Sequence, residues 1–213
     1  MKITGYRTLS TFHAWGRAIG DVNGAIESAV TEVPIVIIET DAGIEGVGIG
    51  SHADLDRLFP AIEGEDPRAV SALFDRMVAR VFKSGHAGAT YGGLATLDAA
   101  LWDIKAKAAG EPLWRLLGGR DRYVPGYASG LDIALNADEL HEFYRAMAER
   151  GYVAGKLKGG LDLQADLERL GVIADALRVN TDAPGLMIDA NESWQVKQAV
   201  RYISAIEERF DLL

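Results

Sequence analysis

The sequence contains no cysteine, so disulfide bonds and thiolate metal sites are excluded. It has no apolar run of about eighteen residues, and residues 1–7 lack the apolar core of a signal peptide. Basic residues are outnumbered, since 22 Lys and Arg face 31 Asp and Glu, and the net charge is −9. We therefore expect a cytoplasmic protein that binds neither nucleic acid nor a membrane.

Nucleotide-binding loops are also missing. The first strand–helix connection of the second half has no Gly-rich GxGxxG fingerprint, and no GxxxxGK[ST] motif occurs anywhere. What the chain does have is 213 residues with 48% apolar and 25% charged side chains. That composition is typical of a globular protein with a sizeable core, organised as one large domain or two small ones.

The first half predicts strands followed by helices. Residues 2–12 suit a strand, and residues 13–28 suit a long loop, either a lid or binding loop or a plain surface loop. A hairpin follows over residues 33–50, with turn chemistry at residues 41–43. Its return strand alternates glycine with Val and Ile, so one face is nearly bare and another segment should pack closely against it.

Two helices complete this half. Asp66 and Pro67 predict an N-cap and first helical position for a helix that reaches about residue 82. A loop over residues 83–89 leads to a second helix over residues 94–109, with Gly110 as its C-cap. We expect residues 1–122 to form an α+β domain.

Strands and helices alternate in residues 123–213, at the spacing of βα units in a parallel sheet. A capping box at residues 136–139 opens the first of three predicted helices. The expected strands cover residues 124–130, 153–158 and 185–189, the helices end near residues 150, 179 and 208, and residues 210–213 begin a fourth strand.

Lys156 and Lys158 stand two apart in a predicted strand, so they point to the same side. Two neighbouring ammonium groups lower each other's pKa, which is one way to make a lysine into a base. Such a pair alone is more often solvated, but Ser129, Asp189 and Asn191 also fall at the carboxyl ends of strands, the edge where α/β folds bind ligands. One aspartate cannot hold Mg²⁺ alone, so two further acids would be expected there.

Four segments together resemble the enolase superfamily, and within it the mandelate racemase/muconate lactonizing enzyme group. They are residues 99–105 (AALWDIK), 112–119 (PLWRLLGG), 156–158 (KLK) and 188–191 (IDAN). The resemblance implies an α+β capping domain over residues 1–122, followed by an incomplete TIM-type barrel over residues 123–213. That barrel would contain the first three βα units and the start of the fourth strand.

The resemblance also implies a function, namely Mg²⁺-dependent abstraction of a proton α to a carboxylate to give an enediolate. Such an enzyme would be a racemase, epimerase or dehydratase of hydroxy acids, with sugar acids as one possible class. Lys158 would be the base, Lys156 would tune it, and Asp189 would be the first of three metal ligands. Asn191, Ser129, Trp15 and His52 would contact the small carboxylate substrate, the last two from loops that close over the barrel.

A complete barrel needs eight βα units, so we expect these residues to belong to a longer polypeptide and to be inactive alone. The resemblance implies a homo-oligomer, a dimer or an octamer, for the full-length protein. Two alternatives remain open at this point. One is an aldolase in which a lysine forms a Schiff base, and the other is a non-catalytic binding module or inactive fragment of the same fold.

Overall fold

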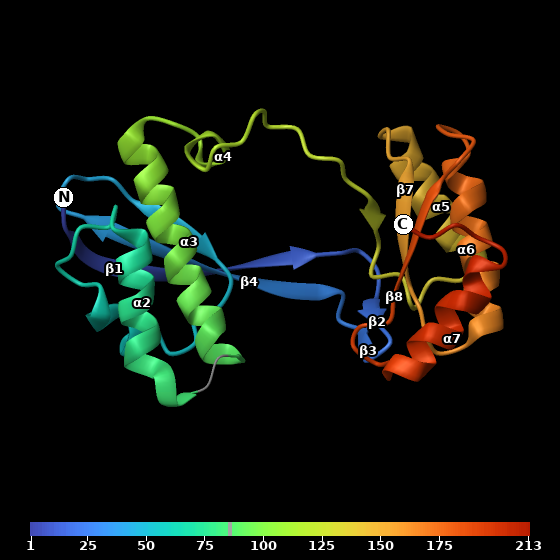
Figure 1. Ribbon diagram of the computed structural model, residues 1–213, viewed down its shortest axis with the longest axis horizontal. Helices are drawn as coiled ribbons and strands as arrows, with labels where there is room; N and C mark the ends of the chain where they lie inside the picture. Colours follow the sequence, from blue (N-terminus) through green and yellow to red (C-terminus); the bar gives the residue numbers. More distant parts are fainter. Residues whose placement is uncertain (85–86) are drawn as a thin grey trace. The chain divides into compact units, whose positions relative to one another are not determined.

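The computed structural model describes residues 1–84 and 87–213, so Gly85 and His86 of the predicted loop over residues 83–89 lie outside it. The chain forms two compact units: Met1–His13 with Thr31–Tyr123, and Ala14–Val30 with Val124–Leu213 (Figure 1). The strands are β1 (Ile3–Ala14), β2 (Ile19–Asp21), β3 (Gly24–Ile26), β4 (Val30–Thr40), β5 (Gly46–Ile49), β6 (Ala128–Ser129), β7 (Ala154–Lys158) and β8 (Gly185–Asp189). The helices are α1 (Leu55–Leu58), η1 (Phe59–Ala61), α2 (Val70–Val81), η2 (Phe82–Ser84), α3 (Ala89–Ala109), α4 (Leu113–Leu116), α5 (Ala137–Glu149), α6 (Leu163–Leu177) and α7 (Val196–Glu207).

The first unit is a three-stranded sheet, in the order β1-β4-β5, with α2 and α3 packed on it. Strands β4 and β5 pair antiparallel as the predicted hairpin. The prediction that another segment packs closely against the bare face of β5 is confirmed. A Cβ atom on Gly48 would lie only 1.9 Å from the carbonyl oxygen of Thr96, so helix α3 lies directly against this face. The core between sheet and helices is apolar, with Val36, Ile38, Leu97 and Leu101 among its buried side chains.

The predicted start of α2 is wrong. The helix begins at Val70, and its N-cap position is Ala69 rather than Asp66. The Asp66 carboxylate instead accepts hydrogen bonds from the backbone N–H and the guanidinium of Arg68, which hold residues 66–69 in a turn. Helix α3 begins five residues earlier than predicted, at Ala89, and ends at the predicted Gly110 with φ +67°.

The second unit is built on a parallel sheet in the order β6-β7-β8, with α5 and α6 packed together against it. The predicted capping box of α5 is present, since Asn136 and Glu139 each accept from the other's backbone N–H. Helix α6 has Asp162 as its N-cap. The expected fourth strand begins as predicted, because Leu212 forms a parallel bridge to Leu186 of β8.

Residues 14–30 differ from the prediction in two ways. They contain a short antiparallel hairpin, β2–β3, where a long loop was expected. They also belong to the second unit rather than to a contiguous domain of residues 1–122. The reason is that residues 17–20 form hydrogen bonds with the segment after β6. The Gly20 N–H donates to the Leu131 carbonyl at 3.0 Å, and the Arg17 guanidinium donates to the Gly130 carbonyl.

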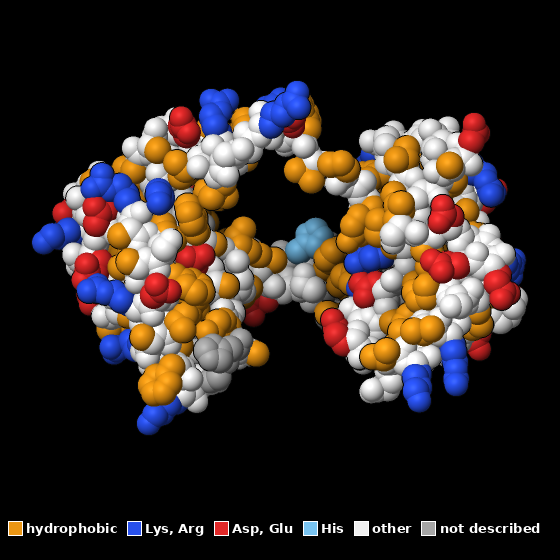
Figure 2. All heavy atoms as spheres, in the orientation of Figure 1, with side chains coloured by type: hydrophobic (Ala, Val, Ile, Leu, Met, Phe, Trp, Pro, Cys, Tyr) orange, Lys and Arg blue, Asp and Glu red, His pale blue; other side chains and the backbone are white. Residues whose placement is uncertain are grey.

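The surface of both units mixes charged and hydrophobic side chains (Figure 2). Exposed apolar residues of the second unit include Leu161, Val196 and Val200. Among the described residues, no helix has both the length and the apolar character needed to cross a membrane.

Candidate functional site

The register of β7 and β8 sets the geometry of the site. These strands are parallel, and Lys158 stands opposite Asp189. A Cβ atom on Gly155 would meet Tyr144 and Ile173, and Leu157 is buried among the same helices. Gly155 and Leu157 therefore face the helices, and strand alternation places Lys156 and Lys158 on the opposite face. The predicted meeting of lysines and carboxylate at one edge of the sheet is confirmed.

Both lysines converge on one carboxylate oxygen. Lys158 Nζ donates to Asp189 Oδ2 at 2.7 Å, and Lys156 Nζ lies 2.9 Å from the same oxygen. Lys158 Nζ also donates to Asn191 Oδ1 at 2.9 Å. The Lys158 side chain is only 6% exposed and that of Lys156 is 20% exposed, so these are largely desolvated ion pairs.

The electrostatics differ from the expected mutual repulsion of two lysines. The hydrogen bond from Lys156 to Asp189 raises the pKa of Lys156, although burial acts in the opposite direction. For Asp189, burial raises the pKa, but hydrogen bonds from Lys158, Lys156 and the Asn191 backbone outweigh it and leave the pKa well below its ordinary value. The prediction of a lowered pKa at Lys156 is therefore wrong for this arrangement, because a carboxylate lies between the two cations.

Asn191 and Ser129 lie beside the lysines. The turn after β8 is held by a hydrogen bond of 3.0 Å from the Asn191 N–H to Asp189 Oδ1, and Asn191 has a left-handed φ of 44°. Ser129 pairs with Lys156 across β6 and β7, so it occupies the same face of the sheet. The structure thus brings both residues to the candidate site, while their contact with substrate stays a prediction.

The two predicted loop residues belong to different units. Trp15 lies in the Ala14–Val30 segment of the second unit, where its backbone N–H donates to the Ala29 carbonyl at 2.8 Å. His52 lies in the first unit, with its Nε2 3.0 Å from the Ile35 carbonyl oxygen. The contact of either residue with substrate stays a prediction.

Two residues near the lysines were not expected from the sequence. The ring centroid of Tyr127 lies 5.4 Å from Lys156 Nζ, a cation–π contact that helps to hold this side chain. Tyr127 stands two positions before Ser129, so period-two alternation could have indicated that its side chain lies on the same face as Ser129 and the lysines. Asn23 of the β2–β3 turn donates to the Asn191 carbonyl at 3.0 Å, across 168 residues of sequence, and no local signal predicts that contact.

The donor set fits part of a magnesium site. Asp189 offers a carboxylate and Asn191 an amide oxygen, both of which suit a hard cation. Within residues 1–84 and 87–213, however, no three His, Asp or Glu side chains gather closely enough to surround a metal ion. One carboxylate is fewer than such a cation takes, so the remaining oxygen ligands would have to come from elsewhere.

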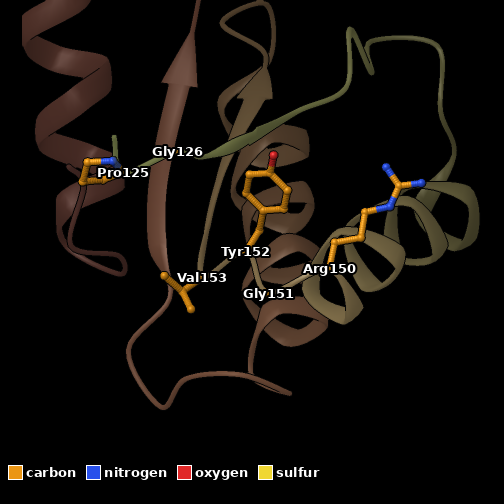
Figure 3. A pocket seen from close by; sticks show the side chains of 6 residues that line it. All are labelled: Pro125, Gly126, Arg150, Gly151, Tyr152 and Val153. Carbon is orange, nitrogen blue, oxygen red and sulfur yellow. The ribbon is translucent and has the colours of Figure 1, made fainter. Parts of the chain in front are cut away.

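A separate hollow of about 300 Å³ lies at the other end of the sheet (Figure 3). It is lined by Pro125 and Gly126 before β6 and by residues 150–153, which lead into β7. Ligands of parallel α/β sheets bind at the carboxyl ends of the strands. This hollow is therefore not the candidate active site.

Comparison with known proteins agrees with this geometry. Residues 21–118 match the family model of the mandelate racemase/muconate lactonizing enzyme N-terminal domain. Residues 139–213 match the enolase C-terminal domain-like family. A solved racemase from Streptomyces coelicolor A3(2) with bound magnesium superposes with a TM-score of 0.87 at 31% identity, covering 99% of this chain and 60% of that one. The predicted fold class, an α+β capping domain followed by part of a barrel, is confirmed.

Two curated relatives indicate a range of chemistry. A 3,6-anhydro-alpha-L-galactonate cycloisomerase of Streptomyces coelicolor is 33% identical over 168 residues, which is 78% of this chain and 45% of the relative. An L-talarate/galactarate dehydratase of Salmonella typhimurium is 31% identical over 200 residues, 88% of this chain and 49% of the relative. The chain thus spans about half the length of these curated relatives.

Proposed function

Because the chain belongs to the mandelate racemase/muconate lactonizing enzyme group of the enolase superfamily, we propose that it supplies part of the active site of an enzyme acting on hydroxy acids. The reaction would begin with removal of the proton α to the substrate carboxylate. The observation that carries this proposal is the 2.7 Å contact between a nearly buried Lys158 Nζ and Asp189 Oδ2, at the carboxyl ends of adjacent parallel strands.

In this proposal Lys158 is the base. Its Nζ can accept the α-proton only as the neutral amine, whose lone pair takes up the proton. Asn191, whose Oδ1 already lies 2.9 Å from that Nζ, keeps a polar partner beside the base. Lys156 contributes a positive charge on the same face, because its hydrogen bond to Asp189 raises its pKa, and this charge favours the binding of a carboxylate substrate.

Asp189 would serve as one ligand of Mg²⁺, which when bound would supply positive charge to the substrate carboxylate as negative charge builds up on it. Asp189 is ionised at neutral pH, since hydrogen bonds from both lysines hold its pKa well below its ordinary value, and its carboxylate oxygens suit a hard cation that would take the place of the lysines there. A homo-oligomeric assembly is part of the same proposal, and light scattering of the purified full-length natural protein would test it.

The substrate class that we propose is a sugar acid, since the relatives include a dehydratase and a cycloisomerase of such acids. The test follows the α-proton by ¹H NMR in D₂O, with galactarate, L-talarate and 3,6-anhydro-alpha-L-galactonate as probes. We expect the full-length natural protein to exchange or eliminate the α-proton of at least one probe, and only with Mg²⁺ present.

Substitution of Lys158 separates this proposal from its rivals. Lys158→Ala should lower the rate by about 10²–10⁴-fold, the usual contribution of a general base. Lys197→Ala, which removes an exposed lysine of α7, is the matched control and should keep the wild-type rate. Unchanged activity of Lys158→Ala would contradict the proposal, and borohydride trapping of pyruvate on the protein would favour the Schiff-base alternative instead.

A further inference from the structure

Two buried aspartates outside the proposed chemistry hold the backbone of the strand that carries Lys158. Asp132 Oδ1 accepts a hydrogen bond of 2.9 Å from the Lys158 N–H. Asp166 Oδ2 accepts one of 2.6 Å from the Gly160 N–H. Asp132 is 0% exposed and Asp166 is 4% exposed, and the two come from different elements, the loop after β6 and the first turn of α6.

We propose that Asp132 and Asp166 are positioning residues, which fix the end of β7 so that Lys158 Nζ is held where the α-proton has to be removed. This inference rests on the proposed function, because it assigns Lys158 the role of the base. Neither aspartate touches the reacting atoms, and each acts only through the main chain on either side of Gly159.

Asp132 is itself held from two sides. Its Oδ2 accepts from the Tyr144 hydroxyl of α5 at 2.7 Å, and the Arg169 guanidinium of α6 lies 3.6 Å from its Oδ1. Arg169 also donates to the Asp132 and Leu135 carbonyls, each at 2.7 Å. The carboxylate therefore cannot turn away from Lys158 without breaking a network that joins both helices.

Asp166 is held just as firmly. Its Oδ2 also accepts from the Tyr202 hydroxyl of α7 at 2.6 Å. The backbone approaches the carboxylate closely because residue 159 is glycine, where a Cβ atom would lie 2.6 Å from Asp166 Oδ1. Gly160 has a φ of +115°, a conformation that other residues rarely adopt, and its carbonyl accepts from Trp194 Nε1 at 2.8 Å.

Burying two carboxylates is unfavourable unless each is well hydrogen-bonded. Burial raises the pKa of both Asp132 and Asp166, and their hydrogen bonds only partly offset this. An apolar pair would fill this space at a lower cost in solvation, but it could not accept from the Lys158 and Gly160 amides. The buried acceptors are therefore explained by the need for a fixed strand end, since a displacement of about 1 Å at a catalytic group can cost 10²-fold in rate.

The test compares substitutions that remove the acceptor with substitutions that keep it. Asp132→Ala and Asp166→Ala remove the oxygen, whereas Asp132→Asn and Asp166→Asn keep one oxygen for the amide. Asn136→Ala and Asp162→Ala are matched controls, because they remove the N-caps of α5 and α6 and weaken the same helices without a contact to the strand end.

We expect the two Ala variants of the full-length natural protein to lower kcat for α-proton removal by about 10- to 100-fold, with KM changed little. The Asn variants should restore kcat to within a few-fold of wild type, and the two cap variants should lower only the melting temperature. Ala variants with the kcat of the cap controls would overturn the inference. If the Ala variants do not fold, the Asn variants provide the test. A kcat of one-tenth of wild type or less in either Asn variant would overturn the inference.

A second measurement does not depend on turnover. Amide hydrogen exchange, followed residue by residue by NMR, should show faster exchange at Lys158 in Asp132→Ala and at Gly160 in Asp166→Ala, relative to the cap controls. If the wild-type protein removes no α-proton from any probe, the proposed function fails. Amide exchange at Lys158 and Gly160 then still tests whether Asp132 and Asp166 hold the end of β7. Equal exchange in Ala and cap variants would refute the holding of the strand end, whatever the activity.

Discussion

Replacing Asp189 with asparagine should leave the ammonium groups of Lys156 and Lys158 in uncompensated electrostatic repulsion. The substitution keeps the shape of the side chain and removes the negative charge that lies between Lys156 and Lys158. In the wild-type protein both Nζ atoms lie within 2.9 Å of the same oxygen, Asp189 Oδ2. The two cations are therefore close together on one face of β7, and the Asp189 carboxylate between them compensates their repulsion.

The magnitude follows from Coulomb's law. The two Nζ atoms can be no more than about 5.6 Å apart, and at an effective dielectric constant of about 20 their repulsion is then about 3 kcal/mol. Breaking a buried ion pair by removing one partner costs a similar amount, about 3–5 kcal/mol. We therefore expect Asp189→Asn to lower the free energy of unfolding of the second unit by about 3 kcal/mol at neutral pH.

Urea unfolding in the presence of EDTA is the appropriate assay, because chelation removes any cation that could replace the lysines at Asp189. Asp175→Asn is the matched control, since it removes an exposed acid from α6 and should change stability by no more than about 0.5 kcal/mol. A second substitution sharpens the test: Lys156→Met should stabilise the Asp189→Asn variant, although in the wild-type background it breaks an ion pair. If Lys156→Met has the same sign of effect in both backgrounds, the repulsion argument is refuted.

Three further outcomes are expected. Gly160→Ala should cost about 1–3 kcal/mol in urea unfolding, because φ is +115° and the new Cβ would lie 2.8 Å from Ala190 Cβ, whereas Gly171→Ala in α6 meets nothing closer than 3.8 Å and should be neutral or stabilising. Burial raises the pKa of Asp132 above 3.8, so protonation stabilises the folded state below that value and this contribution is lost as pH rises through the raised pKa. The unfolding free energy of wild type minus that of Asp132→Asn should therefore decrease from pH 4 towards neutrality, and a flat or rising difference would contradict the assignment. Asn23→Ala removes the hydrogen bond to the Asn191 carbonyl, so limited proteolysis should cut residues 14–30 faster than in wild type, and equal cleavage rates would show that this contact does not hold the hairpin.

Local signals predicted much of this fold correctly. The capping box at Asn136, the glycine at the end of α3 and the alternation of glycine with Val and Ile in β5 each depend on neighbours within a few residues. Asp66 shows where such signals fail, because its carboxylate has a stronger partner in Arg68, two residues on, than in the first turn of a helix. At Asp66 the neighbouring guanidinium therefore takes the place of a helix N-terminus as the partner of the carboxylate.

The candidate site was predictable in its residues but not in its electrostatics. Period-two alternation brings Lys156 and Lys158 to one face, and parallel pairing brings Asp189 level with them. That both lysines share one oxygen depends on side-chain conformation, which sequence spacing does not determine. Asp132 and Asp166 were missed for a related reason, since they bind backbone N–H groups, which every residue other than proline carries and which leave no mark in a sequence.

The discontinuous second unit has a consequence for the order of folding during synthesis. The hairpin at residues 19–26 is held by the Leu131 carbonyl, which accepts from a backbone N–H, and by the Asn191 carbonyl, which accepts from the Asn23 side chain 168 residues earlier in the sequence. At a translation rate of about 5–20 residues per second, Asn191 emerges roughly 8 to 34 seconds after the hairpin. The first unit can complete its sheet within that interval, whereas residues 14–30 have to wait for their partners in the rest of the second unit. A ribosome-bound chain should therefore present this hairpin to chaperones and proteases until the turn after β8 has been made.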